Sequence, residues 1–194
     1  MRTDLPRRSG PSIAAILAVA VGLLAAACGG GGSPGGSSAP RSPVPATNAA
    51  EAALLPTDAQ ALPAASYEDY RQLLSQLEGT PVVVNIWGSW CGPCRDEIDD
   101  LVAAAHSYGG RVQFLGVDIL DARDSARAFM DEFGVTYPSL FDPSPGGDIR
   151  NQLGYVGQPV TIFYDAAGEK VADWEGPISA ERLHEHLEAL VNTP

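Results

Sequence analysis

The sequence Trp87-Gly88-Ser89-Trp90-Cys91-Gly92-Pro93-Cys94 holds two cysteines separated by two residues. It follows the apolar run 81–87 and precedes a helix-like stretch that ends near Tyr108. A cysteine at the turn from a strand into a helix lies beside free backbone N–H groups and the positive end of the helix dipole, which both stabilise a thiolate. We therefore expect Cys91 to attack a disulfide, and Cys94, one turn into the helix, to resolve the mixed disulfide.

A zinc half-site and a purely structural disulfide are the two other interpretations of this cysteine pair. A closed zinc site needs four ligands, usually thiolates or imidazoles. Outside the pair, the sequence offers Cys28, His106, His184 and His186, and the last two are two positions apart, so on a helix they point in different directions. We therefore expect no bound metal, and no cofactor other than the redox-active disulfide itself.

Residues 87–95 resemble the active-site segment of thioredoxin-fold proteins. The chain from 64 to 191 is similar to the TlpA/ResA/CcmG (DsbE) branch, the membrane-tethered extracytoplasmic thiol-disulfide oxidoreductases. Asn85 stands where thioredoxins carry a buried Asp, and Arg95-Asp96-Glu97 matches the Cys-Arg-x-Glu pattern of the branch. Pro159 follows Cys94 by 65 positions, which leaves room for the branch's central insertion.

The resemblance implies an α/β, thioredoxin-like fold with a mixed central sheet, helices on both faces and a TlpA-type central insertion. Residue patterns agree, because strands alternate with helices before a terminal hairpin. We expect strands at 82–87, 112–118, 160–164 and 170–174, with the turn of the hairpin at 165–168. We expect helices at 67–77, 93–108, 124–133 and 147–153, and a last helix that Ser179 caps and that runs to 191.

The segment Gly157-Gln158-Pro159 forms the second element of the predicted site. In thioredoxin-fold proteins a cis proline opens a strand opposite the cysteine pair, and Pro159 has the matching position. Proline tolerates the cis form at a cost of about 0.5–1 kcal/mol and has no N–H to donate to a sheet. A cis bond would leave the backbone of Gln158 free to bind an extended substrate; the alternative is a trans proline that starts a strand.

Resolution by Cys94 requires a group that removes its proton. By the resemblance, Asp121 lies in a loop that supplies an acidic residue near the thiols in this branch, so it is our first candidate. Glu97, one turn after Cys94, is the second. Acidic residues near the start of a helix also stabilise the helix dipole, which is the alternative explanation for Glu97.

The chain begins with a basic segment, and residues 13–27 form an apolar run of signal-peptide length, shorter than the roughly 20 residues that span a membrane. The run ends in Leu24-Ala25-Ala26-Ala27-Cys28, which resembles a lipobox. We expect a lipoprotein signal peptide over 1–27, a lipid on Cys28 and a flexible tether rich in Gly, Ser, Pro and Ala over 28–63. Secretion after Ala27 and an uncleaved anchor are the alternatives.

Residues 64–194 are predicted to form one domain, and they carry 8 Lys and Arg against 21 Asp and Glu. This excess of negative charge argues against nucleic acid as a partner and against electrostatic docking on anionic lipid. We expect a monomer on the extracytoplasmic face of a bacterial cell membrane. Its expected partners are the thiols and disulfides of exported proteins.

Three functions fit the sequence. The first is reduction of exported proteins, such as apocytochrome c before haem attachment, with electrons from a membrane donor of the CcdA/DsbD type; the Gly92-Pro93 dipeptide favours it. The second is the reverse reaction, oxidation that installs disulfides. The third is a non-catalytic binding or metallochaperone module on the same fold. A peroxidase of the peroxiredoxin type is disfavoured, because Gly88 stands where that class has Thr or Ser.

Overall fold

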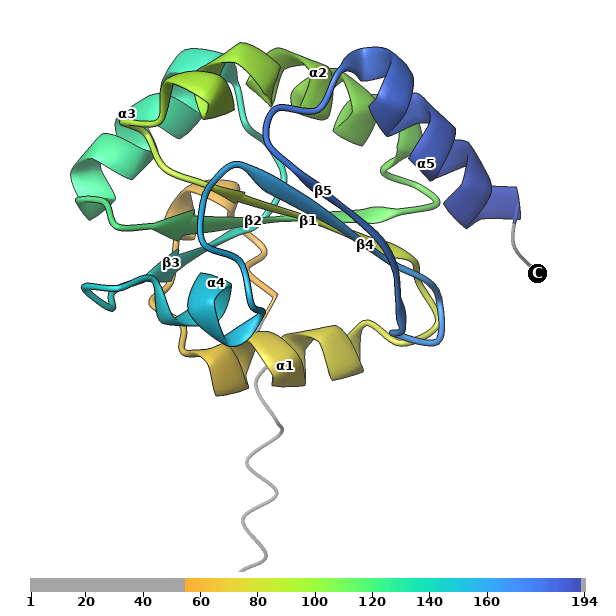
Figure 1. The fold of residues 1–194 in the computed structure, drawn as a ribbon, viewed down its shortest axis with the longest axis horizontal. Coiled ribbons are helices and arrows are strands. Elements are labelled where there is room, and N and C mark those ends of the chain that lie inside the picture. Colours follow the sequence, from red (N-terminus) through yellow and green to blue (C-terminus); the bar gives the residue numbers. More distant parts are fainter. Residues whose placement is uncertain (1–54, 193–194) are drawn as a thin grey trace, which may run out of the picture. The chain divides into compact units, whose positions relative to one another are not determined.

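The structure is a computed structural model that describes residues 55–192. Its core is a five-stranded mixed sheet with the strand order β3-β2-β1-β4-β5 (Figure 1). β1 pairs in parallel with β2, and β2 pairs in parallel with β3, whereas β4 runs antiparallel to both β1 and β5. The strands are β1 (Val82–Trp87), β2 (Gln113–Ile119), β3 (Ser139–Asp142), β4 (Val160–Tyr164) and β5 (Lys170–Glu175).

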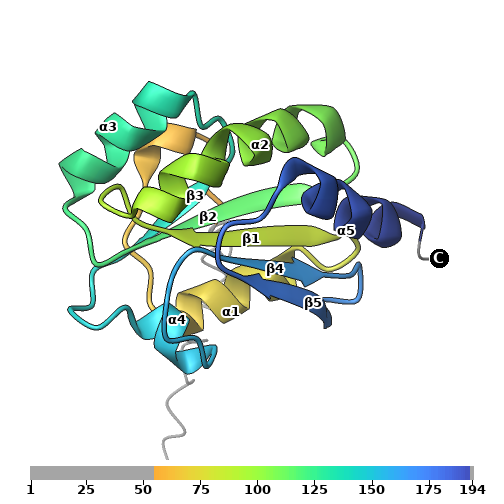
Figure 2. The ribbon, with the colours of Figure 1, turned by 45° about the horizontal axis from the view of Figure 1, so that its top comes forward.

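Helices cover both faces of this sheet, as predicted (Figures 1 and 2). α2, α3 and α5 lie on one face, and α1 and α4 lie on the other. The helices are α1 (Tyr67–Gln76), α2 (Gly92–Tyr108), α3 (Arg123–Phe133), α4 (Asp148–Gln152) and α5 (Ala180–Asn192). Every predicted helix is present within one or two residues of its expected bounds.

All six residues of β1 are buried, because this strand lies in the middle of the sheet between two layers of helices. Successive side chains of a strand point to opposite faces. Val83 and Trp87 therefore belong to the core beneath α2, α3 and α5, and Val82, Val84 and Ile86 belong to the core beneath α1 and α4. The carboxyl end of β1 leads directly into the turn that carries the two cysteines.

β3 is an element that the sequence analysis missed. It has four residues at an edge of the sheet and directly follows Pro138, so its pattern is too short to distinguish it from a loop. The chain at 63–65 runs beside it, with hydrogen bonds from the amide of Ala65 to the carbonyl of Phe141 and from the amide of Phe141 to the carbonyl of Pro63. This segment covers the open edge of the strand.

The packed domain also begins before position 64, where the sequence analysis had ended the tether. A 3-10 helix spans Ala59–Ala61, and the side chain of Leu62 is fully buried in the core beneath α2 and α3. Arg123 and Arg127 of α3 donate to backbone carbonyls of residues 60–62. The predicted signal peptide, Cys28 and the first part of the tether lie outside the described residues.

Candidate active site

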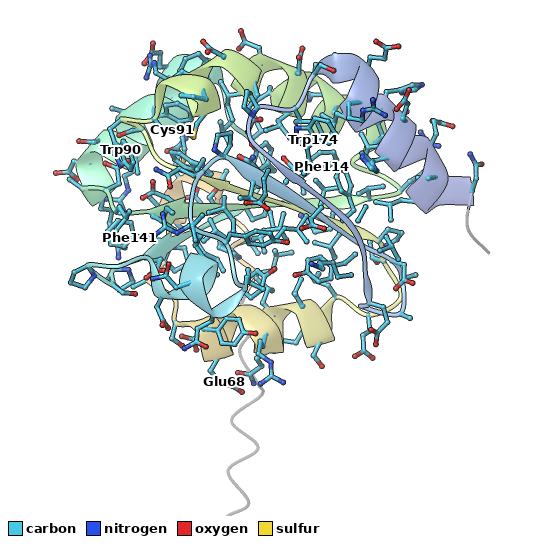
Figure 3. All side chains as sticks on the ribbon, in the orientation of Figure 1. Glu68, Trp90, Cys91, Phe114, Phe141 and Trp174 are labelled. Atoms are coloured by element: carbon cyan, nitrogen blue, oxygen red, sulfur yellow. A yellow bond between two sulfur atoms is a disulfide. The ribbon has the colours of Figure 1, made fainter. Side chains whose placement is uncertain are left out.

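The two cysteines form a disulfide at the start of α2, where Figure 3 shows Cys91 beside Trp90. The S–S distance is 2.08 Å, and the two Cα atoms are 5.3 Å apart. Cys91 is the N-cap residue of the helix, and its sulfur accepts a hydrogen bond from the backbone N–H of Cys94 at 3.2 Å. The sulfur of Cys91 thus lies at the positive end of a 17-residue helix, where a thiolate is stabilised.

The loop before β4 lies across from this sulfur. The peptide bond between Gln158 and Pro159 is cis, as predicted. The carbonyl oxygen of Gln158 is 3.9 Å from the sulfur of Cys91. Arg150 of α4 donates to the side-chain oxygen of Gln158 at 2.9 Å, so the central insertion contacts the predicted substrate-binding residue. No sequence pattern predicts this contact, because Arg150 is an isolated basic residue in a short helix.

Glu97 lies one turn after Cys94 in α2 and is buried. Its two carboxylate oxygens accept hydrogen bonds from the side-chain amide of Asn85 in β1 at 2.8 Å and from the backbone N–H of Ile178 at 2.7 Å. The amide of Asn85 also reaches the hydroxyl of Thr161, two residues after Pro159. Burial raises the pKa of Glu97 to about 7, although both hydrogen bonds oppose this shift. A carboxyl group with this pKa can exchange protons at neutral pH.

Asp121 lies in the loop between β2 and α3 and contacts the active-site turn. Its Oδ2 accepts a hydrogen bond from the backbone N–H of Ser89 at 2.6 Å, and its Oδ1 accepts one from the backbone N–H of Ala122 at 2.7 Å. The preceding carbonyl, that of Leu120, accepts a hydrogen bond from the indole N–H of Trp90 at 3.0 Å. The structure thus brings Asp121 to the turn that carries Cys91, and its proposed proton transfer to Cys94 stays a prediction.

Asp118 is a further acidic residue that the sequence analysis did not single out. It lies in β2, not in the loop, and its side chain is fully buried. Burial is the main cause that raises the pKa of Asp118 to about 9, and the charge of Asp121 adds to it. An acidic residue between Val117 and Ile119 in a buried strand was the signal that could have identified it.

Two exposed apolar side chains lie in the segments that carry the disulfide and the Gln158–Pro159 bond. Among the described residues, the large apolar side chains that are exposed are Trp90 (55%), Val156 (90%) and Val171 (54%). Trp90 directly precedes Cys91, and Val156 lies two positions before Gln158. Val171 lies at the start of β5, at the end of that strand away from Pro159. Exposed apolar side chains in the two segments that meet at the sulfur of Cys91 are suited to contact another polypeptide.

Two features are absent from residues 55–192. No group of three or more His, Cys, Asp or Glu side chains in this part of the chain is close enough together to hold a metal ion. No helix in the same range has the length and apolar character that crossing a bilayer requires.

Comparison with known proteins places the fold and the site in one family. Residues 57–172 match the AhpC/TSA family. The thiol:disulfide interchange protein DsbE of Allochromatium vinosum is 35% identical over 64% of this chain and 68% of its own length. The thiol:disulfide interchange protein HelX of Rhodobacter capsulatus is 30% identical over 59% of this chain and 62% of its own length. The matched part of this chain therefore covers about two thirds of the length of these two relatives.

This chain is also similar to a solved structure of a thiol-disulfide isomerase. The secreted thiol-disulfide isomerase of Corynebacterium glutamicum is 30% identical, covers 62% of this chain and 75% of its own, and superposes with a TM-score of 0.56. A thioredoxin-like fold with a cysteine pair at the start of α2 defines the class as the thioredoxin-fold thiol-disulfide oxidoreductases. Within it, the chain belongs to the AhpC/TSA family. This confirms the resemblance to DsbE-type proteins that the sequence motifs indicated.

We predict that Glu97→Gln makes the stability of the protein less dependent on pH. The raised pKa means that the folded state binds a proton at Glu97 more tightly than the unfolded chain does between pH 4.5 and 7. Stability from this group is therefore fully present below pH 4.5 and is lost as the pH rises through 7, by an amount on the order of 3 kcal/mol. Glutamine does not titrate, so the loss should shrink.

Urea unfolding of the wild type and of Glu97→Gln at pH 5 and pH 8 measures this difference. Asp99→Gln is the control, because it removes an exposed acidic residue from the same helix. An equal fall in the free energy of unfolding between the two pH values for the wild type and Glu97→Gln would contradict the assignment.

Proposed function

We propose that this protein is an extracytoplasmic thiol-disulfide oxidoreductase that reduces disulfides of exported proteins. The observation that carries the proposal is the Cys91–Cys94 pair at the N-terminus of α2, with the Gln158–Pro159 loop opposite the sulfur of Cys91. The relatives named as thiol:disulfide interchange proteins support the reaction type. The client, the electron donor and the direction of electron flow are part of the proposal.

The reaction begins with the reduced pair. The thiolate of Cys91 attacks one sulfur of the client disulfide, which forms a mixed disulfide and releases the first client thiolate. The thiolate of Cys94 then attacks the sulfur of Cys91 and releases the second client thiolate. The client gains two electrons, and the Cys91–Cys94 pair is left as the disulfide seen in the structure. An electron donor that acts at the extracytoplasmic face of the membrane must then return two electrons to the Cys91–Cys94 pair.

The second step needs a base that removes the proton of Cys94. Glu97 is the better supported of the two predicted candidates, because it is buried one turn from Cys94 and its pKa is about 7. Both oxygens of Asp121, by contrast, accept backbone N–H groups. We assign the proton transfer to Glu97, with Asn85 and the backbone of Ile178 holding its carboxyl group in place.

We expect the client to bind at the surface around the sulfur of Cys91. An extended client segment would lie between Trp90 and Val156 and form backbone hydrogen bonds to Gln158. The exposed apolar area favours a client with apolar side chains beside its cysteine. Apocytochrome c before haem attachment is a candidate client, and a membrane protein of the CcdA/DsbD type is the candidate electron donor.

The location follows from the amino-terminal sequence. The apolar run 13–27 and the small residues before Cys28 support export and lipidation of this cysteine. The lipid would hold the protein at the extracytoplasmic face of the membrane, and the segment after Cys28 would act as its tether. Lipidation also removes the one cysteine outside the redox pair, which would otherwise be free to form unwanted disulfides.

We predict that Cys94→Ser traps covalent complexes between Cys91 and client proteins. Without a second thiol, the mixed disulfide cannot be resolved and accumulates. The measurement is non-reducing electrophoresis and mass spectrometry of proteins purified with the variant from cells. Cys91→Ser with Cys94→Ser is the matched control. Recovery of no disulfide-linked protein with Cys94→Ser would contradict the exchange mechanism.

We predict that Val156→Glu weakens recognition of a protein client without slowing the chemistry. The KM for reduction of insulin disulfides should rise about tenfold, as expected for loss of an apolar contact at an interface. The rate with the small disulfide DTNB should not change. Val171→Glu introduces the same charge on β5 and is the control. An unchanged KM, or an equal rise in both variants, would remove Val156 from the client-binding surface.

We predict that Cys28→Ala releases the protein from the membrane fraction, because the lipid has no other attachment site. Fractionation of cells followed by immunodetection measures this. Cys91→Ser should remain in the membrane fraction. Persistence of Cys28→Ala in that fraction would indicate an uncleaved apolar anchor in place of a lipid.

A further inference from the structure

Arg150 of α4 is a half-buried cation that contacts the loop opposite the reactive sulfur and has no carboxylate partner. Its guanidinium donates to the side-chain oxygen of Gln158 at 2.9 Å, to the carbonyl of Gly146 at 3.1 Å and to the side-chain oxygen of Asn151 at 3.2 Å. All three acceptors are neutral. Among residues 55–192, five of the eight Lys and Arg side chains pair with a carboxylate, and Arg150 is not one of them. Its charge is therefore free to interact with a bound molecule.

The guanidinium is held in one place by the loop before α4. Gly147 is the N-cap residue of α4 and has a φ of +69°, a left-handed conformation that favours glycine. A Cβ atom at Gly147 would lie 3.8 Å from Cζ of Arg150, so the backbone of this loop packs against the guanidinium. The side-chain N–H2 group of Asn151 donates to the carbonyl of Gly146 at 2.8 Å, the same oxygen that accepts from Arg150. A guanidinium fixed in this way loses little conformational entropy when it binds a ligand.

Two donor groups at this contact have no acceptor in the part of the chain that the structure describes. A guanidinium only donates, so the amide oxygen of Gln158 faces Arg150 and the N–H2 group of Gln158 faces away. This N–H2 group donates to no described residue, and neither does the second N–H of Nη1 of Arg150. The backbone carbonyl of Gln158 is 3.9 Å from the sulfur of Cys91. The two donor groups therefore lie about one side-chain length from the place where a client sulfur would bind.

An extended client bound at Gln158 would bring one of its side chains to these donor groups. Backbone pairing of two extended segments puts the Cβ atoms of facing residues about 4.5–5.5 Å apart. A client residue that is next to the client cysteine and faces Gln158 therefore has its side chain beside the carboxamide of Gln158 and the guanidinium of Arg150. Both groups only donate there, and one of them is charged, so the group that fits is a carboxylate.

We propose that Arg150 and the carboxamide of Gln158 form a subsite for an acidic side chain of the client, in a position next to the client cysteine. The inference rests on the proposed exchange at Cys91 and adds to it a preference for one class of client. Successive side chains of an extended client point to opposite sides, so an acidic residue in this subsite is compatible with apolar contacts to Trp90 and Val156. The excess of negative charge in the domain opposes acidic clients at long range, so the preference arises only on contact.

The test measures the first step of the exchange with peptides that carry Glu, Gln or Lys on both sides of a single cysteine, activated as its pyridyl disulfide. Attack of the Cys91 thiolate on the peptide sulfur forms the mixed disulfide and releases thiopyridone, whose absorbance gives the rate constant. The reduced full-length protein carries Cys28→Ala, so that only the redox pair holds thiols. Each rate constant is divided by that of the same peptide with dithiothreitol. The Glu peptide should then react about fivefold faster than the Gln peptide, the gain expected for a partly exposed ion pair, and the Lys peptide should react most slowly.

Arg150→Gln should lower the ratio of the Glu rate to the Gln rate to about one, and Arg150→Lys should retain part of the preference, because it keeps the charge. Arg71→Gln is the matched control: it removes an exposed cation beside the turn at Gly168, at the other end of β4 from Pro159, and should keep the wild-type ratio. A wild-type ratio of one, an unchanged ratio in Arg150→Gln or an equal fall in Arg71→Gln would overturn the proposal. Failure of the wild type to react with any of the peptides would contradict the proposed exchange at Cys91 itself.

Discussion

Burial of β1 on both of its faces is the constraint from which the arrangement of the site follows. Six consecutive buried residues require a layer of helices above and below the strand, and the two cores of the domain supply them. The strand ends at Trp87, and α2 begins five residues later. The short turn between them leaves Cys91 as the N-cap of α2, and the antiparallel pairing of β1 with β4 brings the Gln158–Pro159 loop to the same end of the sheet.

The site also has buried polar groups beneath the turn that carries Cys91. Asn85, Glu97 and Asp118 are buried on the face that α2 and α3 cover, where apolar side chains would give a more stable core. Burial raises the pKa values of both acids, Glu97 to about 7 and Asp118 to about 9. Buried titratable groups gather at functional sites. In our account Glu97 transfers a proton near Cys94, and Asn85 and the backbone of Ile178 hold its carboxyl group in place.

Much of the fold could be predicted from the sequence, because β1, β4 and the long helices have regular apolar patterns and clear start and stop residues. The edge strand β3 could not be predicted, since four residues give no period. The packing of Leu62 was hidden in a segment whose composition suggests a flexible tether. At the site, the spacing of Cys91, Cys94 and Pro159 was sufficient to predict the cysteine pair and the proline opposite it. The burial of Asp118 and the contact between Arg150 and Gln158 depend on tertiary structure that spacing does not encode.

The reduction potential of the Cys91–Cys94 pair tests the central claim most directly. The full-length protein would be equilibrated with glutathione or dithiothreitol buffers of known ratio, and the fraction of the pair that is reduced would be measured by mass spectrometry. A reductant of exported proteins requires a stable disulfide, so we predict a potential of about −270 mV or lower. A potential near −120 mV would mean that the protein oxidises its clients, and the absence of a reversible couple would contradict thiol–disulfide exchange itself.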